Sequence, residues 1–256
     1  MSNYQTEKED LTAALRWAAR LGLSEGVCNH FSVEVAPDRY LINPQGLHWE
    51  EVCAGDILLI DGKGLVIEGR HAIEPSAFFI HSWIHRLNPQ AKAILHTHMP
   101  YATALTLVQD GRLIFSHQNA LRFWGRVGYD DVYGGIALDD AEGERIGRSM
   151  AGKEVMFMAS HGVTVTGASL AWAFDDLYYL ERACMHQTLA QQVAAGRPLR
   201  VVSEAHCRAI AAQIAGERAQ SDLFFSAIKR LLDRDQPGWR DAGRSAGAGP
   251  VPQLVM

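Results

Sequence analysis

Two histidines follow a short apolar segment in "AILHTH" (93–98), and the apolar residues are typical of a buried strand. Side chains two residues apart on a strand project from the same face, so His96 and His98 point together while Thr97 points away. Two imidazoles held rigidly about 7 Å apart at their Cα atoms can bind one divalent ion. The spacing therefore predicts two ligands of a metal centre.

A third ligand is required, because catalytic zinc sites usually take three protein ligands and leave one position open. The best candidate is His161, which follows the apolar segment "VMFMAS" (155–160) and precedes Gly162. At the end of a second strand, its side chain could reach the end of the first. The alternative is a set of hydrogen-bonded core histidines, but three histidines at two strand ends favour a metal.

A competing pair, His81 and His85, has the four-residue spacing of the zinc ligands in an HExxH helix. Residue 82 is Ser, so the catalytic Glu of that motif is absent. The pair flanks Trp83 and Ile84 and is expected to border a packed helix face. We therefore favour His96, His98 and His161 as the metal ligands.

Composition excludes several classes of partner. The 256 residues are 48% hydrophobic, enough for a large core, and the formal net charge of −5 gives no basic surface for nucleic acid. The four cysteines form no CxxC pair, which favours reduced thiols in a cytoplasmic protein. The polar start "MSNYQTEKEDL" is no signal peptide, and no apolar run is long enough to span a membrane.

The elements that must position these histidines mix helices and short strands. A capping box, Thr6-x-x-Glu9, predicts the start of a first helix. Strands mixed with helices over one continuous core indicate a single α/β domain over 1–234. The Gly- and Pro-rich end, 235–256, predicts a flexible tail or an arm on a neighbouring subunit. Further helices are predicted over 76–87, 170–195 and 203–232, and strands over 31–36, 40–43, 56–69 (a hairpin), 91–98, 112–116 and 155–160.

Five segments resemble, in the same order, the class II aldolase and adducin head-domain family, which includes L-fuculose-phosphate aldolase and L-ribulose-phosphate 4-epimerase. The resemblance implies a three-layer α/β/α fold with a mostly antiparallel central sheet. It also implies a homotetramer with active sites between subunits, and a divalent metal, Zn²⁺ or Mn²⁺, on the three histidines. The matching segments are "GVCNHFSVEV" (26–35), "LINPQGLHWEEV" (41–52), "EPSAFFIHSWIHRLNPQAKAILHTHMPYATAL" (74–105), "SHGVTVTG" (160–167) and "AFDDLYYLERACMHQ" (173–187).

The sequence departs from the family where sugar-phosphate aldolases carry "PSSE" before the HxH. In those enzymes the Glu contacts the metal and acts as acid and base, but its position here is Ala77. Glu74 lies three residues earlier and could replace it, one helical turn away. The alternative is that Glu74 is a helix-start carboxylate favoured by the helix dipole.

The phosphate site of the aldolases has also changed. Their "SGN" segment reads "CNH" (28–30) here, and the two serine positions read Pro75 and Ser76. Proline removes a backbone donor, Asn29 fills space that glycine leaves open, and His30 could offer an N–H or a positive charge. A carboxylate, phenol or carbonyl substrate is therefore easier to accommodate than a phosphate.

Other polar residues are candidates to complete the pocket. Gly46 is kept at a turn that lies behind the pocket in the family, and both Gly46 and Ser76 are substrate-binding candidates. Tyr101 follows the HxH closely and is a catalytic candidate with His30 and Glu74; the alternative is a tyrosine packed at a helix start. Gln118 is expected to bind substrate at a subunit interface.

These residues predict a metal-dependent carbon–carbon lyase acting on a small, non-phosphorylated carboxylate or carbonyl compound. A three-histidine ion is a Lewis acid that can stabilise an enolate, and decarboxylation forms a carbanion without prior proton removal. Losing the Glu therefore harms a decarboxylase less than an aldolase. The runner-up is a non-haem Fe²⁺ oxygenase using the same histidines. A non-catalytic adducin-like scaffold predicts loss of the histidines, and all three are present.

Overall fold

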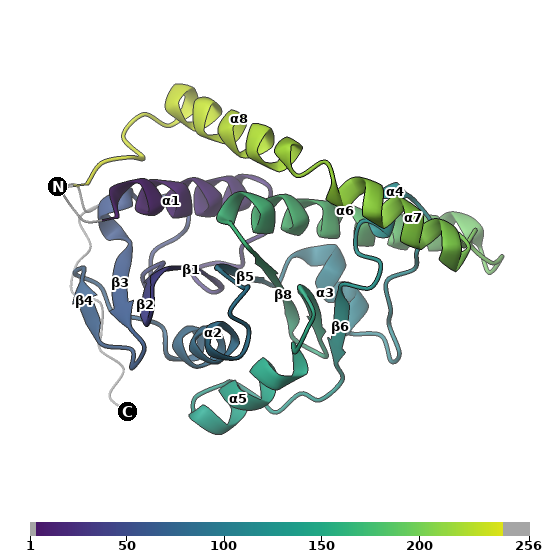
Figure 1. Ribbon diagram of the computed structural model, residues 1–256, viewed down its shortest axis with the longest axis horizontal. Coiled ribbons are helices and arrows are strands. Elements are labelled where there is room, and N and C mark those ends of the chain that lie inside the picture. The colour runs from purple at the N-terminus through teal and green to yellow at the C-terminus, as the bar shows by residue number, and fades with distance from the viewer. Residues whose placement is uncertain (1–3, 243–256) are drawn as a thin grey trace.

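The centre of the protein is one eight-stranded sheet with the order β4-β3-β2-β1-β5-β8-β7-β6. The computed structural model describes residues 4–242 (Figure 1). Every neighbouring pair is antiparallel except β6 and β7, which confirms a mostly antiparallel sheet. The strands are β1 (His30–Ala36), β2 (Arg39–Ile42), β3 (Leu58–Asp61), β4 (Val66–Glu68), β5 (Ala93–Thr97), β6 (Val127–Asp130), β7 (Val155–Met158) and β8 (Gly162–Gly167).

Helices cover both faces of the sheet, which confirms the three-layer α/β/α arrangement (Figure 1). One face carries α1 (Gln5–Arg20) and α6 (Leu170–Ala194), with α8 (Ala219–Asp235) lying over them. The other face carries α2 (Pro75–Leu87) and α5 (Asp140–Ser149). The remaining helices are η1 (Ala54–Asp56), α3 (Pro100–Thr106), α4 (Gln118–Leu121) and α7 (Glu204–Ala215).

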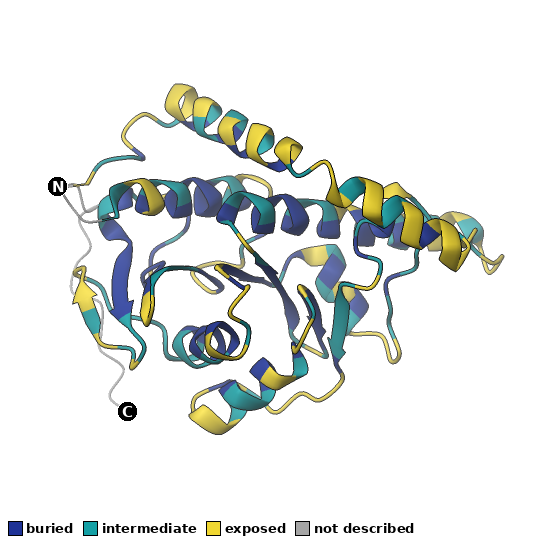
Figure 2. Cartoon of the chain, in the orientation of Figure 1, coloured by how far each residue is buried: buried dark blue, intermediate teal, exposed yellow. Residues whose placement is uncertain are grey.

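The central strand β5 separates two apolar clusters, and this explains its uniformly apolar sequence. Leu95 packs toward α1 and α6, whereas Ile94 packs toward α2 and α5. A strand buried on both faces reads as a continuous apolar run rather than an alternating one. Exposed residues gather on α7 and on the outer side of α8 (Figure 2). His96 lies on the same face as Ile94, so it faces the layer that contains α2.

Two predicted helix features are wrong. Helix α1 begins after Tyr4 and has no side-chain cap, so Thr6 and Glu9 form no capping box; Glu9 binds Arg240 instead. The helix predicted over 203–232 is two helices, because α7 ends at Ala215 and α8 begins at Ala219. Gly216 between them weakens helix continuation, since glycine is a poor helix former.

The strand predicted over 112–116 is also wrong. Two of its backbone N–H groups bind side chains instead of a neighbouring strand. The Leu113 N–H donates to the Tyr129 hydroxyl (3.0 Å) and the Ile114 N–H to the Gln187 side-chain oxygen (2.7 Å). Satisfied in this way, the segment runs beside the sheet without joining it.

Residues 236–242, which the sequence assigns to the tail, pack against the rest of the domain. Trp239 is only 1% exposed and belongs to the main apolar cluster. Its carbonyl accepts a hydrogen bond from the Ala54 N–H (3.1 Å), and the Asp241 carbonyl accepts one from Gly55 (3.0 Å). The rest of the predicted tail, 243–256, lies outside the described residues. Among residues 4–242, none of the helices combines the length and apolarity needed to cross a bilayer.

Candidate metal centre

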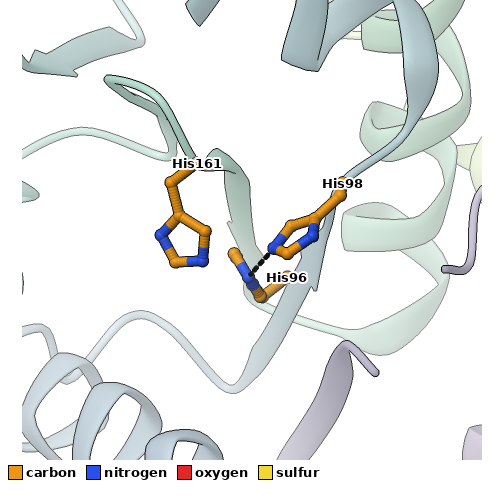
Figure 3. Close-up of side chains that lie close together, drawn as sticks. All are labelled: His96, His98 and His161. Carbon is orange, nitrogen blue, oxygen red and sulfur yellow. Dashed lines mark hydrogen bonds between the residues drawn. The ribbon is translucent and has the colours of Figure 1, made fainter. Parts of the chain in front are cut away.

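The three predicted ligands converge at one end of the sheet (Figure 3). His96 is on β5, His98 follows it directly, and His161 lies in the turn between β7 and β8. Because β5 and β8 are paired in the sheet, the β7–β8 turn is held beside the end of β5. One nitrogen from each ring lies within 4.8 Å of those of the other two. The sheet therefore brings the three imidazoles together.

The geometry and protonation of these rings fit a divalent ion. Nε2 of His96 and Nε2 of His98 are 3.2 Å apart. Two ligands at 2.0–2.1 Å from a tetrahedral zinc ion would lie roughly 3.3 Å apart. Burial lowers the pKa of His96 well below its usual value and the pKa of His161 to about 4. The His96 and His161 rings are therefore neutral near pH 7, which is the form that binds metals.

Neighbouring groups orient two of the rings. The Nδ1–H of His98 donates to the Glu25 carboxylate, and Nδ1 of His96 lies 3.3 Å from the Thr164 hydroxyl. Such contacts fix the tautomer and tilt of metal-binding histidines. No local spacing in the sequence marks Glu25, because its proximity to His98 depends on how the α1–β1 loop meets the end of β5.

A cavity of about 450 Å³ opens beside the three histidines. Among the predicted site residues, it is lined by Asn29, His30, Gly46, Glu74 and Ser76. The remaining lining residues, which were not predicted from the sequence, are Val27, Cys28, Gln45 and Ile136. None of these lining side chains is a lysine or an arginine. The cavity therefore offers a phosphate group no lysine or arginine side chain.

Glu74 lies at the cavity but acts as the N-cap of α2. Its carboxylate accepts hydrogen bonds from the Ala77 N–H (2.7 Å) and from the Ser76 hydroxyl. Ala77 is 1% exposed, packs in an apolar cluster with Tyr40 and Leu58, and does not line the cavity. The structure therefore supplies no carboxylate from position 77.

Two of the predicted site residues, Tyr101 and Gln118, lie outside the histidine cavity. Tyr101 lines a separate cavity with Tyr178 and Arg182, and its backbone N–H donates to Glu181. Gln118 is exposed at the start of α4 and does not line the histidine cavity. Within one chain neither side chain joins the metal ligands, and their proposed roles remain predictions.

The competing pair, His81 and His85, belongs to a buried hydrogen-bonded network. The Ser32 hydroxyl lies between them, 2.6 Å from Nδ1 of His81 and 2.8 Å from Nε2 of His85. Nε2 of His81 is 2.7 Å from Nδ1 of His30. Over residues 4–242, the only group of three or more potential metal ligands is the one at His96. A sequence signal existed, since His30 and Ser32 are two apart on one strand and the other two histidines are four apart on one helix.

Comparison with known sequences supports a common origin. Residues 9–188 match the family model of the class II aldolase and adducin N-terminal domain. A putative aldolase class 2 protein from Caulobacter vibrioides is 31% identical over 236 residues, covering 91% of each chain. The decarboxylase NovR from Streptomyces niveus is 29% identical, covering 86% of this chain and 83% of that protein. A 4-hydroxy-3-prenylphenylpyruvate oxygenase/4-hydroxy-3-prenylbenzoate synthase from Streptomyces roseochromogenus is 29% identical, covering 73% and 68%.

Solved structures show the same fold. An aldolase II superfamily protein from Pseudomonas syringae superimposes with a TM-score of 0.85 at 31% identity, covering 94% of this chain and 97% of that one. An L-fuculose 1-phosphate aldolase from Glaciozyma antarctica gives a TM-score of 0.80 at 26% identity, covering 91% and 92%. With the matching sheet, histidine cluster and family model, the chain belongs to the class II aldolase and adducin N-terminal domain family.

Proposed function

We propose that the protein is a divalent-metal-dependent carbon–carbon lyase for a small, non-phosphorylated carboxylate or carbonyl compound. His96, His98 and His161 would hold the ion, Zn²⁺ or Mn²⁺. The observation that carries the proposal is the convergence of these three imidazoles beside a cavity in a class II aldolase-type fold. The ion would supply a Lewis acid that holds substrate oxygens and stabilises enolate charge when the carbon–carbon bond breaks.

Asn29 provides a candidate contact for a substrate oxygen. Its side-chain carbonyl accepts hydrogen bonds from the backbone N–H groups of Glu25 (3.1 Å) and His98 (3.4 Å). Asn29 lines the cavity, and its Nδ2 group is buried and has no hydrogen-bond partner among the described residues. A buried donor without a partner is costly, so a substrate carbonyl or carboxylate oxygen would relieve that cost. This supports Asn29 as a substrate-binding residue.

The lining favours decarboxylation or a related cleavage over sugar-phosphate aldol chemistry. The cavity has no cationic side chain to hold a dianionic phosphate, and Ala77 supplies no acid or base. In a decarboxylation the electrons of the broken bond pass to the remaining carbon framework, and a proton from water or a side chain replaces the carboxylate. Similarity to a protein described as a decarboxylase supports this choice.

A non-haem Fe²⁺ oxygenase is the second candidate, because one relative is described as an oxygenase. The same three histidines would hold iron and leave open positions for substrate and O₂. An adducin-like scaffold without chemistry is less well supported, since it gives no reason to keep three converging histidines beside a cavity.

The resemblance also supports a cytoplasmic homotetramer with sites between subunits. Two apolar side chains at the cavity, Val27 and Ile136, are 50% and 70% exposed in the single chain. A neighbouring subunit would cover them, and it could also bring Gln118 or Tyr101 of another copy to the site. Sedimentation of the purified protein tests the tetramer directly.

Metal analysis of the purified protein tests the central proposal. We expect one zinc or manganese ion per chain in the wild type and none in His96→Ala. His206→Ala, which changes an exposed histidine on α7, serves as the control and should retain the ion. Bound iron with oxygen consumption would favour the oxygenase. Absence of bound metal after supplying zinc, manganese and iron in turn would overturn both proposals.

A further inference from the structure

A chain of hydrogen-bonded groups runs from the cavity into the interior between β1 and α2. It begins at His30, passes through His81 and the Ser32 hydroxyl to His85, and ends at the carbonyl of Ala91. The successive separations are 2.7, 2.6, 2.8 and 2.7 Å. Every side chain in it is buried. In such a chain, the positions of the protons decide which group donates and which accepts at each hydrogen bond.

The Ala91 carbonyl fixes the inner end, because a carbonyl oxygen can only accept a hydrogen bond. Nδ1 of His85 must therefore carry a proton and donate it to that oxygen. Burial lowers the pKa of His85 to about 3, so the ring has no second proton near pH 7. Its Nε2 is then an acceptor, and the Ser32 hydroxyl donates to it.

The same reasoning carries the direction outward. Ser32 has one hydroxyl proton, which it gives to His85, so its oxygen accepts from the Nδ1–H of His81. Burial keeps His81 neutral, with its pKa well below the usual value. Nε2 of His81 therefore accepts from the Nδ1–H of His30. What remains is Nε2 of His30, an unprotonated nitrogen.

This outer nitrogen belongs to a residue that lines the cavity. Among residues 4–242, the only hydrogen bond of the His30 ring is the one at Nδ1, so Nε2 has no hydrogen-bond partner there. The His30 ring stacks on that of His96, with centroids 4.8 Å apart and planes inclined by 25°. The nitrogen is therefore an acceptor placed next to the metal ligands.

We propose that Ser32, His81 and His85 are positioning residues that hold His30 in one tautomer, so that its Nε2 accepts a hydrogen bond from a substrate hydroxyl. This inference rests on the proposed function and narrows its substrate class. The substrate would be a hydroxy acid or phenolic acid, with its hydroxyl on His30 and a carbonyl or carboxylate oxygen on Asn29. An anionic oxygen at His30 would face a lone pair and be disfavoured, which agrees with loss of the phosphate site.

Histidine tautomers can be measured directly in protein labelled with ¹⁵N-histidine, by two-bond proton–nitrogen correlation spectra, with or without metal. We expect His30, His81 and His85 each to carry the proton on Nδ1. Ser32→Ala should leave His30 as a mixture of tautomers, and Ser32→Thr, which retains the hydroxyl, should restore one form. A wild-type His30 protonated at Nε2 would overturn the inference. Circular dichroism verifies that each variant is folded.

A binding experiment on the zinc-loaded protein tests the hydroxyl itself. Glycolate and acetate differ by one hydroxyl and serve as the probes. The measured quantity is the ratio of acetate to glycolate dissociation constants. We expect this ratio to be up to about tenfold larger in the wild type than in Ser32→Ala, because one hydrogen bond contributes that much. Ser32→Thr should give a ratio close to that of the wild type. An equal preference in all three proteins would overturn the role of His30.

Metal content separates the possible failures. We expect His30→Gln to retain the ion, because His30 lies outside the group of three rings whose nitrogens are within 4.8 Å. Loss of metal in His30→Gln would make His30 a fourth ligand and overturn the inference. Failure of the wild type to bind any metal would overturn only the proposed function, since the tautomers can be measured in the metal-free protein.

Discussion

Gly162 lies so close to His98 that a methyl group on its Cα would stand 2.7 Å from Cδ2 of the His98 ring. The same methyl would stand 2.6 Å from the carbonyl oxygen of Thr97. Real Cβ atoms do not approach other atoms so closely, and the second neighbour is backbone that cannot swing away. The glycine after His161 therefore lets the β7–β8 turn reach the HxH segment.

Gly162→Ala should separate His161 from the other two ligands. We expect at least about a tenfold loss of zinc affinity, as for other changes that disturb ligand orientation. Overpacking should also lower the free energy of unfolding by about 1–3 kcal/mol. Competition with a chelating dye and denaturant unfolding measure the two effects. Gly216→Ala, at a helix end with an ordinary φ, is the control; wild-type affinity in Gly162→Ala would contradict the predicted crowding.

Glu25→Gln should weaken metal binding, because the His98 ring would lose the carboxylate that fixes its orientation. The carboxylate accepts the Nδ1–H of His98, and loss of such a contact typically costs about 10–100-fold in metal affinity. Chelator competition at fixed pH provides the measurement. Glu50→Gln, which changes an exposed glutamate outside the cavity, should bind as the wild type does. Equal affinities in both variants would show that Glu25 does not orient His98.

Buried neutral histidines predict acid sensitivity of the metal-free protein. Burial lowers the pKa of His30 and His85 to about 3 and that of His161 to about 4. In the unfolded chain these rings titrate near about 6.5, so the unfolded chain binds more protons between about pH 4 and 6.5. Their contribution to stability is complete above that window and is lost as the pH falls through it.

The slope can reach about 1.4 kcal/mol per pH unit for each such histidine. Urea unfolding in the presence of a chelator, at intervals from pH 4.5 to 7.5, measures it. His85→Gln removes one of the rings, so the unfolding free energy of this variant should change less steeply with pH, by the contribution of one histidine. A free energy of unfolding that stays constant from pH 5 to pH 7 would be inconsistent with neutral buried rings.

Ala77→Glu should not create sugar-phosphate aldolase activity. The Ala77 side chain is packed among apolar residues, and a buried carboxylate without a partner should lower the free energy of unfolding by about 2–4 kcal/mol. Assays with L-fuculose 1-phosphate, beside Ala77→Gln as a control of similar size, give the answer. A large gain of activity would show that Asn29, His30 and Pro75 do not impair phosphate binding.

The sequence by itself determined the parts of this protein that depend on short spacing. Residues two apart share a strand face, so His96 and His98 were identifiable as a pair, and a histidine at a second strand end completed the set. The family segments also predicted the layers and the mostly antiparallel sheet. These features are local, or repeat in the same order along the chain.

Only the tertiary structure decided what those residues meet. Pairing of β1 with β5 sets His30 opposite His96, and packing of α2 on β1 places His81 and His85 around Ser32. The same packing places the Ala77 side chain in an apolar cluster. Packing of α3 on α6 places Tyr101 beside a different cavity. Strand register and helix docking join residues dozens of positions apart, and no local spacing encodes them. For that reason the histidine cluster could be predicted from the sequence, whereas Glu25 and Thr164, which contact two of its rings, could not.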